Sequence, residues 1–373
     1  MLLNVDNAAQ WMKERGLLTA ADVVDGRVLI TDAGRRNRNL KVTRGPTASG
    51  YVIKQAPDGG LGRTSTIAAE ASFYRSSTTD PGMAAVRPTV PALVQYVESS
   101  QVLVIELLPD AVPLWAFWTS DESIADRTAA ARLLGSALAA LHGSTPAPRN
   151  DSAWLRPAPP WILGVHRPAA RVFEHISPAN LRALRILQQN PDVCRSLTDL
   201  HDNWRSSAPI HNDVKSDNLL VWKSGDEVQL RIVDWELIQQ GDPLWDVAGA
   251  FCDVWVHWIA AIPLASSKDM EEALKEGRHQ LSAFFPAVRA FWSAYRQQAL
   301  TGREQWDAML QRAIRYAAAR LIQSAYEQSQ DAIDLPNASV VMLQVAANVL
   351  TDPESAQLHL LGIPPSLTLA LQS

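Results

Sequence analysis

The segment His211–Asn218, which reads HNDVKSDN, and the short segment Asp234–Glu236, which reads DWE, decide the fold of this 373-residue chain. As a pattern they give H-x-D-x-K-x-x-N, then two apolar runs, then a second Asp. An H-x-D triplet alone is common in polar turns, and an Asp after an apolar run is often only a strand end. Their occurrence together, at this spacing, is much more informative than either part.

The residues between the two segments predict a β-hairpin. Leu219–Trp222 is a short apolar run, Lys223–Asp226 is typical of a turn, and Val228–Val233 alternates apolar and polar residues like a returning strand. The two strands of a hairpin are antiparallel, so the start of the first strand lies beside the end of the second. We therefore expect Asn218 and Asp234 at the same end of the hairpin.

Two carboxylates and an amide in this order fit the chemistry of phosphoryl transfer. In that reaction one Asp orients the attacking hydroxyl, while an Asn and a second Asp hold the metal ions that bridge the nucleotide phosphates. We expect Asp213 to be the catalytic residue, which accepts the hydrogen bond of the acceptor hydroxyl and takes its proton late. Asn218 and Asp234 are the expected ligands of Mg²⁺, a hard ion that prefers oxygen.

The motif resembles the catalytic segment of the protein-kinase-like superfamily. It is most similar to the aminoglycoside phosphotransferase and choline kinase branch, in which an aromatic residue often follows the metal-binding Asp. The resemblance extends from about Val28 to Gln328. It implies a bilobal α+β fold, with a small β-rich N-terminal lobe (residues 1–108) and a larger, mostly helical C-terminal lobe (109–373) that carries the catalytic hairpin 211–236 and the acceptor site.

The order of predicted elements agrees with that fold class, because strands come first and helices later. The expected strands are Val28–Ile30, Leu40–Thr43, Tyr51–Lys54, Val94–Val97 and Val102–Ile105, with one helix at Thr66–Ser76 among them. The expected later helices are Ala125–His142, Pro178–Asn190, Pro243–Ala261, Lys268–Arg278, Phe285–Leu300, Gly302–Gln328 and Ala338–Leu350.

A kinase-like fold needs a strand lysine that reaches the nucleotide phosphates and a helical glutamate that holds it. Lys54 ends an apolar strand, and Glu70 lies on the helix that follows, so the resemblance assigns them these roles. The alternative interpretation, if each residue is taken alone, is that Lys54 is a solvated edge-strand residue and Glu70 a charge on the surface of a helix. The resemblance also implies that the segment containing Glu106 and Leu108 binds the adenine edge through its backbone.

The loop expected to cover the phosphates departs from the protein kinase pattern. Thr31–Asn39 has one glycine, Gly34, and three arginines where protein kinases have G-x-G-x-x-G. Gly34 would allow a close approach of the backbone to phosphate. The chain has no G-x-x-x-x-G-K-[ST] segment, which excludes a P-loop enzyme.

Three further residues around the motif have expected roles. Lys215 resembles the lysine of serine/threonine protein kinases, and it would add positive charge where negative charge develops in the transition state. His211 is expected to support the loop rather than to act as a base. Asp246 resembles the family's buried aspartate, which hydrogen-bonds the backbone of the catalytic loop.

Composition excludes several other classes of protein. The net charge is −5 with no long basic run, so nucleic acid is not an expected partner. Cys194 and Cys252 are far apart, which indicates neither a disulfide framework nor a metal cluster and favours the cytoplasm. The apolar segment Val247–Ala265 contains Asp253 and His257, so a buried helix is expected there rather than a membrane span. The start of the chain does not resemble a signal peptide.

The leading hypothesis is an ATP- and Mg²⁺-dependent phosphotransferase, with GTP as an alternative nucleotide. Its acceptor would be a small-molecule hydroxyl (aminoglycoside-like or an amino alcohol) or a Ser/Thr hydroxyl of a peptide in natural-product biosynthesis, where a partner enzyme is conceivable. The alternative is an inactive pseudokinase scaffold, which the atypical phosphate loop favours slightly. The retained set of Lys54, Glu70, Asp213, Asn218 and Asp234 argues against it. A metal hydrolase built on His211 and Asp213 lacks further clustered ligands.

Overall fold

The computed structural model divides the chain into two compact units. Unit 1 comprises Met1–Leu114, Ser144–Arg156 and Asn218–Gln239, and unit 2 comprises Trp115–Gly143, Pro157–Asp217 and Gln240–Ser373. The structure describes residues 2–34, 38–45, 49–56, 66–147, 157–174, 176–263, 277, 280–299 and 306–365.

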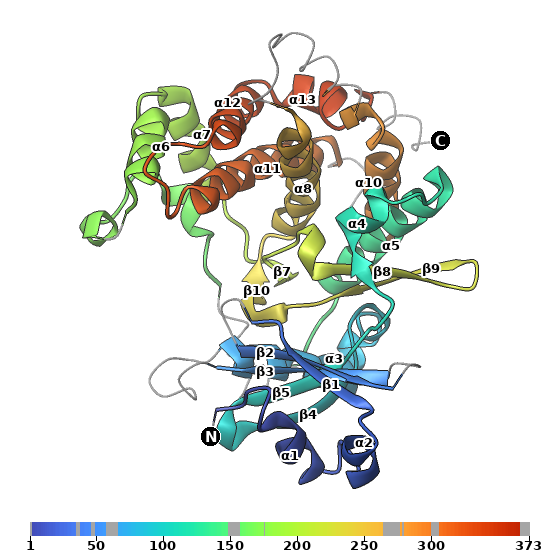
Figure 1. The fold of residues 1–373 in the computed structure, drawn as a ribbon. Coiled ribbons are helices and arrows are strands. Elements are labelled where there is room, and N and C mark those ends of the chain that lie inside the picture. The colour runs from blue at the N-terminus through green and yellow to red at the C-terminus, as the bar shows by residue number, and fades with distance from the viewer. Residues whose placement is uncertain are drawn as a thin grey trace. The chain divides into compact units, whose positions relative to one another are not determined.

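Unit 1 contains an antiparallel five-stranded sheet in the order β1-β2-β3-β5-β4 (blue and cyan in Figure 1). Its strands are β1 (Val28–Asp32), β2 (Arg38–Arg44), β3 (Ser49–Gln55), β4 (Leu93–Val97) and β5 (Val102–Glu106). All five were expected from the sequence, and they are confirmed.

The two faces of this sheet have different partners. Leu40, Val42 and Ile53 pack in one apolar cluster with Trp11 and Met12 of helix α1 (Ala8–Lys13), which precedes the short helix α2 (Ala20–Val24). Side chains alternate between the faces of a strand, so Lys54, next to Ile53, points to the opposite face. Helix α3 (Thr66–Thr79), which carries Glu70, packs against β4 and β5.

The expected hairpin is formed by β8 (Leu219–Ser224) and β9 (Glu227–Ile232). The turn contains Gly225 at a φ of 61°, a backbone conformation that glycine adopts without strain. By its contacts the hairpin belongs to unit 1. One reason is that the short strand β6 (Val112–Pro113) pairs with β8, Val112 opposite Val221.

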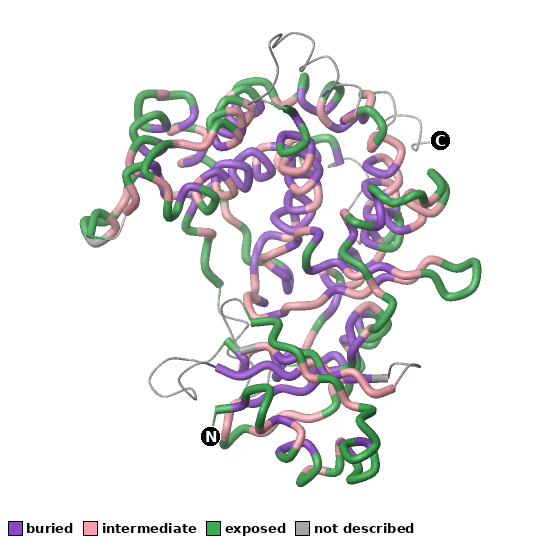
Figure 2. The backbone as a smooth tube through the Cα atoms, in the orientation of Figure 1, coloured by how far each residue is buried: buried purple, intermediate pink, exposed green. Residues whose placement is uncertain are grey.

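Unit 2 is mainly helical. Its helices are α4 (Leu114–Thr119, from Trp115 onward), α5 (Ile124–His142), α6 (Pro178–Gln188), α7 (Pro191–Asp202), α8 (Leu244–Ala261), α10 (Phe285–Gln298), α11 (Trp306–Gln328), α12 (Asn337–Thr351) and α13 (Pro353–His359). Helices α8 and α11 pack on each other and include long buried stretches, coloured purple in Figure 2. Two short strands, β7 (Ala208–Ile210) and β10 (Gln239–Gly241), pair with each other in a separate two-stranded sheet.

The α+β arrangement is confirmed, and α8 is the buried helix expected at the most apolar segment. Among the residues that the structure describes, no helix is long and apolar enough to span a membrane. Helix α7 was missed because the helical pattern was expected to end at Asn190. Asn190 instead caps a new helix, with its side chain accepting from the backbone N–H of Val193 and Pro191 in the first turn. The helix expected at Lys268–Arg278 lies almost entirely outside the described residues.

Candidate functional site

Three expected site residues of unit 1 meet in one charged network. The ammonium of Lys54 lies 2.7 and 3.0 Å from the two carboxylate oxygens of Glu70 and 2.6 Å from Oδ1 of Asp234. The Lys54 and Glu70 side chains are 6% and 0% exposed, whereas that of Asp234 is 36% exposed. Neither Lys54 nor Glu70 is therefore the solvated surface charge that each would be if read alone.

Burial and pairing act in opposite directions on this network. Burial by itself would lower the pKa of Lys54, but the charges of Glu70 and Asp234 raise that pKa above its ordinary value. Burial raises the pKa of Glu70, and the ammonium of Lys54 opposes that shift. Lys54 thus stays cationic.

The backbone around Asp234 is fixed by helix α3. Asp234 adopts left-handed angles, φ 65° and ψ 57°, which Asp tolerates better than most residues. The backbone N–H of the next residue, Trp235, donates to Glu70 Oε1 at 3.2 Å. The Trp235 ring, fully buried, stacks on Phe73 with ring centroids 4.0 Å apart. One helix therefore positions both Lys54 and Asp234.

Asn218 lies at the same end of the hairpin as Asp234, as expected. Leu219 pairs with Ile232, and the backbone N–H of Val233 donates to the carbonyl of Asn218 at 2.9 Å. The Asn218 amide and the partly exposed Asp234 carboxylate offer the hard oxygen ligands that Mg²⁺ takes, so these two residues fit the ion. Within the described part of the chain, no cluster of three or more His, Cys, Asp or Glu side chains could hold a metal ion.

The other residues expected to bind nucleotide have backbone groups that are hydrogen-bonded within the protein. The backbone N–H of Glu106 is occupied by the carbonyl of Ala92 at 2.9 Å, so it is not the group that would meet an adenine. Leu108 follows the end of β5, and its carbonyl accepts from Ala111. The backbone N–H of Gly34 donates to Oδ1 of Asp32 at 2.8 Å. Residues 35–37, with two of the three loop arginines, lie outside the described residues.

In unit 2, Asp246 of helix α8 anchors the start of the segment 211–217, the expected catalytic loop. Its carboxylate, 0% exposed, accepts from the backbone N–H groups of His211 at 2.7 Å and Asn212 at 2.8 Å. Nε2 of His142 lies 3.2 Å from the same carboxylate. Burial alone would raise the pKa of Asp246, but the hydrogen bond and charge of His142 and the hydrogen bond from the His211 backbone lower it below its ordinary value. Asp246 therefore has the position expected of the loop-binding aspartate.

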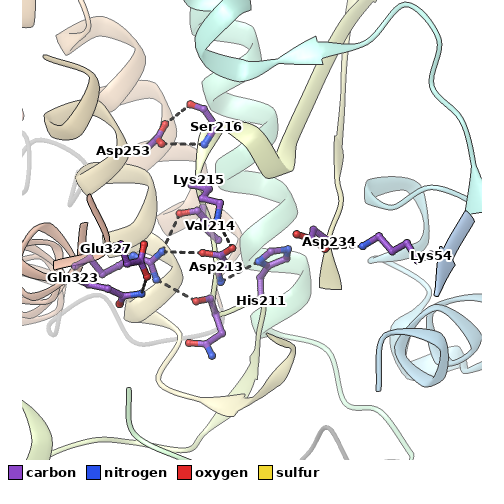
Figure 3. Close-up of polar contacts among 12 residues, drawn as sticks. Lys54, His211, Asp213, Val214, Lys215, Ser216, Asp234, Asp253, Gln323 and Glu327 are labelled. Carbon is purple, nitrogen blue, oxygen red and sulfur yellow. Dashed lines mark hydrogen bonds and ion pairs between the residues drawn. The ribbon is translucent and has the colours of Figure 1, made fainter. Parts of the chain in front are cut away.

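The expected catalytic carboxylate and Lys215 form a close pair. Nζ of Lys215 lies 2.6 Å from Oδ2 of Asp213, and the pair is partly exposed (Figure 3). His211 is fully buried, and its Nδ1 accepts from the backbone N–H of Asp213 at 3.2 Å. His211 therefore contacts the loop backbone, which agrees with a supporting role.

A cavity of about 210 Å³ opens beside this pair, within unit 2. Its lining includes four carboxylates and three basic side chains: Asp213, Asp217, Asp253, Glu327, Lys215, His257 and Arg320. The charged groups of the lining are thus acidic on balance, and they include the expected catalytic Asp213.

One wall of the cavity is built on Asp253 of helix α8. Its carboxylate accepts from the backbone N–H of Ser216 at 3.0 Å and from the Ser216 hydroxyl (Figure 3). Nε2 of His257, one turn later, lies 3.6 Å from Asp253. The imidazole of His257 stacks on Trp115, with ring centroids 4.1 Å apart and an interplanar angle of 7°. Burial raises the pKa of Asp253, and the nearby His257 opposes that shift.

Sequence reasoning missed Asp253 and Arg320 as site residues. Asp253 was noted only as a charge in an apolar segment, and Arg320 not at all. A signal was present for both, because Arg320 stands within the apolar run Tyr316–Ile322 and Asp253 within the apolar helix α8. Charged residues in such runs are seldom buried without a partner.

The structure resembles solved kinases. It is similar to an ethanolamine kinase of Plasmodium vivax, with 11% identity, a TM-score of 0.52, and 91% of this chain and 86% of that chain covered. It is also similar, at a TM-score of 0.46, to a choline/ethanolamine kinase family protein of Mesorhizobium loti, with 18% identity and with 94% of this chain and 98% of that chain covered. A spectinomycin phosphotransferase solved with ADP and spectinomycin has the same TM-score, with 11% identity and with 88% of this chain and 92% of that chain covered. The first of these likenesses shows a protein-kinase-like fold.

No protein of curated function matches the chain in sequence. A family model does match, that of the phosphotransferase enzyme family, and it spans residues 29–284, more than half of the chain. The matched range contains Lys54, Glu70 and the whole of the segment from His211 to Asp246. The chain therefore belongs to the phosphotransferase enzyme family.

Proposed function

We propose that this protein moves the γ-phosphoryl group of ATP to the hydroxyl of a small, positively charged molecule. The observation that carries the reaction class is the buried network of Lys54, Glu70 and Asp234. It pairs a lysine suited to phosphate with a carboxylate suited to a metal ion, as phosphoryl transfer requires. The likeness to solved kinases and the family match support the same class.

Each residue has a defined part in the proposed reaction. Lys54 binds the nucleotide phosphates, and Asn218 and Asp234 supply oxygen ligands to Mg²⁺, which neutralises phosphate charge when it is bound. Asp213 accepts the hydrogen bond of the acceptor hydroxyl. The acceptor oxygen forms a bond to the γ-phosphorus as the bond from that phosphorus to ADP breaks, and the hydroxyl proton passes to the Asp213 carboxylate.

Lys215 has a second part in this scheme. Its ammonium, 2.6 Å from Asp213, balances the charge of the carboxylate and supplies a cation close to the reacting hydroxyl.

The cavity favours a cationic acceptor. Four carboxylates line it, those of Asp213, Asp217, Asp253 and Glu327, against the two cations Lys215 and Arg320 and the imidazole of His257. An ammonium group would balance the excess of carboxylates, since opposite charges attract strongly where water is partly excluded. A volume of about 210 Å³ favours an amino alcohol or an amino sugar over an extended peptide. The solved ethanolamine kinase acts on an acceptor of that kind by its name.

The test is ADP release from MgATP with two matched sets of acceptors. Ethanolamine, 1-amino-2-propanol and glucosamine form the cationic set, and ethylene glycol, propane-1,2-diol and glucose form the neutral set. We expect turnover with a cationic acceptor, and a several-fold rise in its KM on Glu327→Gln with little change for MgATP. Glu354→Gln, on the exposed surface of α13, is the control. ADP release with neither set, together with no binding of MgATP, would refute the proposal.

A further inference from the structure

Arg320 of helix α11 brackets the residue that we propose as catalytic. Its guanidinium donates from Nη1 to the carbonyl of Asn212 and from Nη2 to the carbonyl of Val214, both at 3.3 Å. Nη2 also lies 3.9 Å from Oδ1 of Asp213, the residue between them. Figure 3 draws these contacts at Val214 and Asp213. The planar guanidinium thus spans the peptide groups on both sides of Asp213.

This stretch of backbone is bound from two sides. Asn212 has a φ of 70°, in the left-handed region that Asn adopts more readily than most residues other than glycine. Its N–H is bound by Asp246 of α8, and its carbonyl by Arg320 of α11. An anion on one helix and a cation on another therefore fix the two sides of the same residue.

Helix α8 provides the space that this arrangement needs. Gly249, in the middle of α8, lies so close to the loop that a Cβ there would be 2.7 Å from the carbonyl oxygen of Val214 and 3.4 Å from Cζ of Arg320. Glycine inside a helix costs about 1 kcal/mol relative to alanine, which makes its presence here informative. One turn earlier, the ring of Trp245 lies 5.0 Å from Cζ of Arg320 and covers the guanidinium.

We propose that Arg320 is a positioning residue for phosphoryl transfer, which fixes the direction of the Asp213 carboxylate by binding the backbone on both sides of it. This inference rests on the function proposed above. Arg320 is 7% exposed and is satisfied by loop carbonyls, so its contribution acts through Asp213. A small error in the orientation of a reacting group costs up to about a hundredfold in rate. Loss of the guanidinium should therefore lower kcat much more than it changes the affinity for MgATP.

Two variants and a chemical rescue test this role. Arg320→Lys keeps a positive charge but cannot bind two carbonyls with one rigid group. Arg320→Ala removes the guanidinium and leaves space at a position that lines the open cavity, so added guanidinium ion can enter. Arg315→Ala is the matched control, because Arg315 lies on the same helix and pairs with Asp199 of α7 at 2.8 Å, away from the loop.

We expect kcat to fall about tenfold in Arg320→Lys and about a hundredfold in Arg320→Ala, with KM for MgATP nearly unchanged. Guanidinium ion well below denaturing concentrations should restore kcat of Arg320→Ala several-fold, while urea should not. Neither compound should raise kcat of Arg315→Ala or Asp213→Asn. Rescue separates positioning from folding, because a misfolded protein would not regain kcat.

The proposal is overturned if kcat per folded protein, measured with ethanolamine or glucosamine, stays within about twofold of wild type in both Arg320 variants. That result with an active wild type defeats the role of Arg320 alone. A wild type that releases no ADP and binds no MgATP defeats the proposed function, and the role of Arg320 with it.

Discussion

The ammonium of Lys54 lies 2.6 Å from Oδ1 of Asp234, although 180 positions separate the two residues in the chain. The contact exists because strand β3 and the hairpin β8–β9 both end beside helix α3. Glu70 of that helix binds Lys54 and the backbone N–H of Trp235, and Phe73 stacks on the Trp235 ring. One helix thus sets the relation between the lysine that we propose to bind phosphate and the carboxylate that we propose to bind the metal ion.

The first prediction concerns the free energy of unfolding. Lys54→Met should destabilise the protein by about 3 kcal/mol or more, because it leaves the fully buried Glu70 without its counter-ion. Adding Glu70→Gln should recover much of that loss, since the second change removes the unpaired charge. A double-mutant cycle followed by denaturant unfolding measures this coupling. Additive losses in the double variant would show that the two charges do not stabilise each other.

The second prediction isolates the chemical step. Asp213→Asn should lower kcat by about a hundredfold or more, because an amide cannot take the acceptor proton. Binding of MgATP should persist, since Asp213 belongs to unit 2 and the nucleotide ligands that we propose belong to unit 1. Asp226→Asn, in the exposed hairpin turn, is the control and should retain activity. Near-normal kcat in Asp213→Asn would remove Asp213 from the mechanism.

The third prediction concerns pH. The pKa of Asp246 is lowered in the folded protein, below an ordinary value of 3.8. A lowered carboxyl pKa stabilises the fold at pH values above the unfolded pKa, and this contribution is lost as the pH falls through the folded pKa. Asp246→Asn should therefore cost about 3 kcal/mol at pH 7. The difference from wild type should shrink at pH values below about 3.8.

The measurement is denaturant unfolding of both proteins at pH 7 and at pH 3, with Asp226→Asn as the matched exposed control. A difference between wild type and Asp246→Asn that stays constant, or grows, on acidification would contradict the assigned ionisation of Asp246.

Much of the site could be predicted because its signals are local in sequence. The alternation of Val228–Val233 and the turn before it predict the hairpin, and the hairpin predicts that Asn218 and Asp234 share one end. Lys54 and Glu70 were assigned by resemblance, and the structure brings them together as that resemblance implies. Asp246 was likewise assigned by resemblance and binds the loop backbone.

The parts that were missed depend on packing between segments distant in sequence. The apolar run around Arg320 indicates that this residue is buried, but which groups it binds depends on how α11 packs on α8. The three-residue strands β7 and β10 are too short for alternation to mark them. Asn190 follows one helix and caps the next, and the sequence pattern predicted only the end of the first helix there.

The most direct test of the central claim is a calorimetric titration of the protein with a non-hydrolysable ATP analogue, with and without Mg²⁺, on wild type and Asp234→Ala. We predict binding to wild type that is strengthened by Mg²⁺, and a loss of that strengthening in Asp234→Ala, because the variant lacks the proposed metal-binding carboxylate. Equal Mg²⁺ dependence in the two proteins would contradict the role of Asp234. No binding to wild type under either condition would contradict the phosphotransferase account itself.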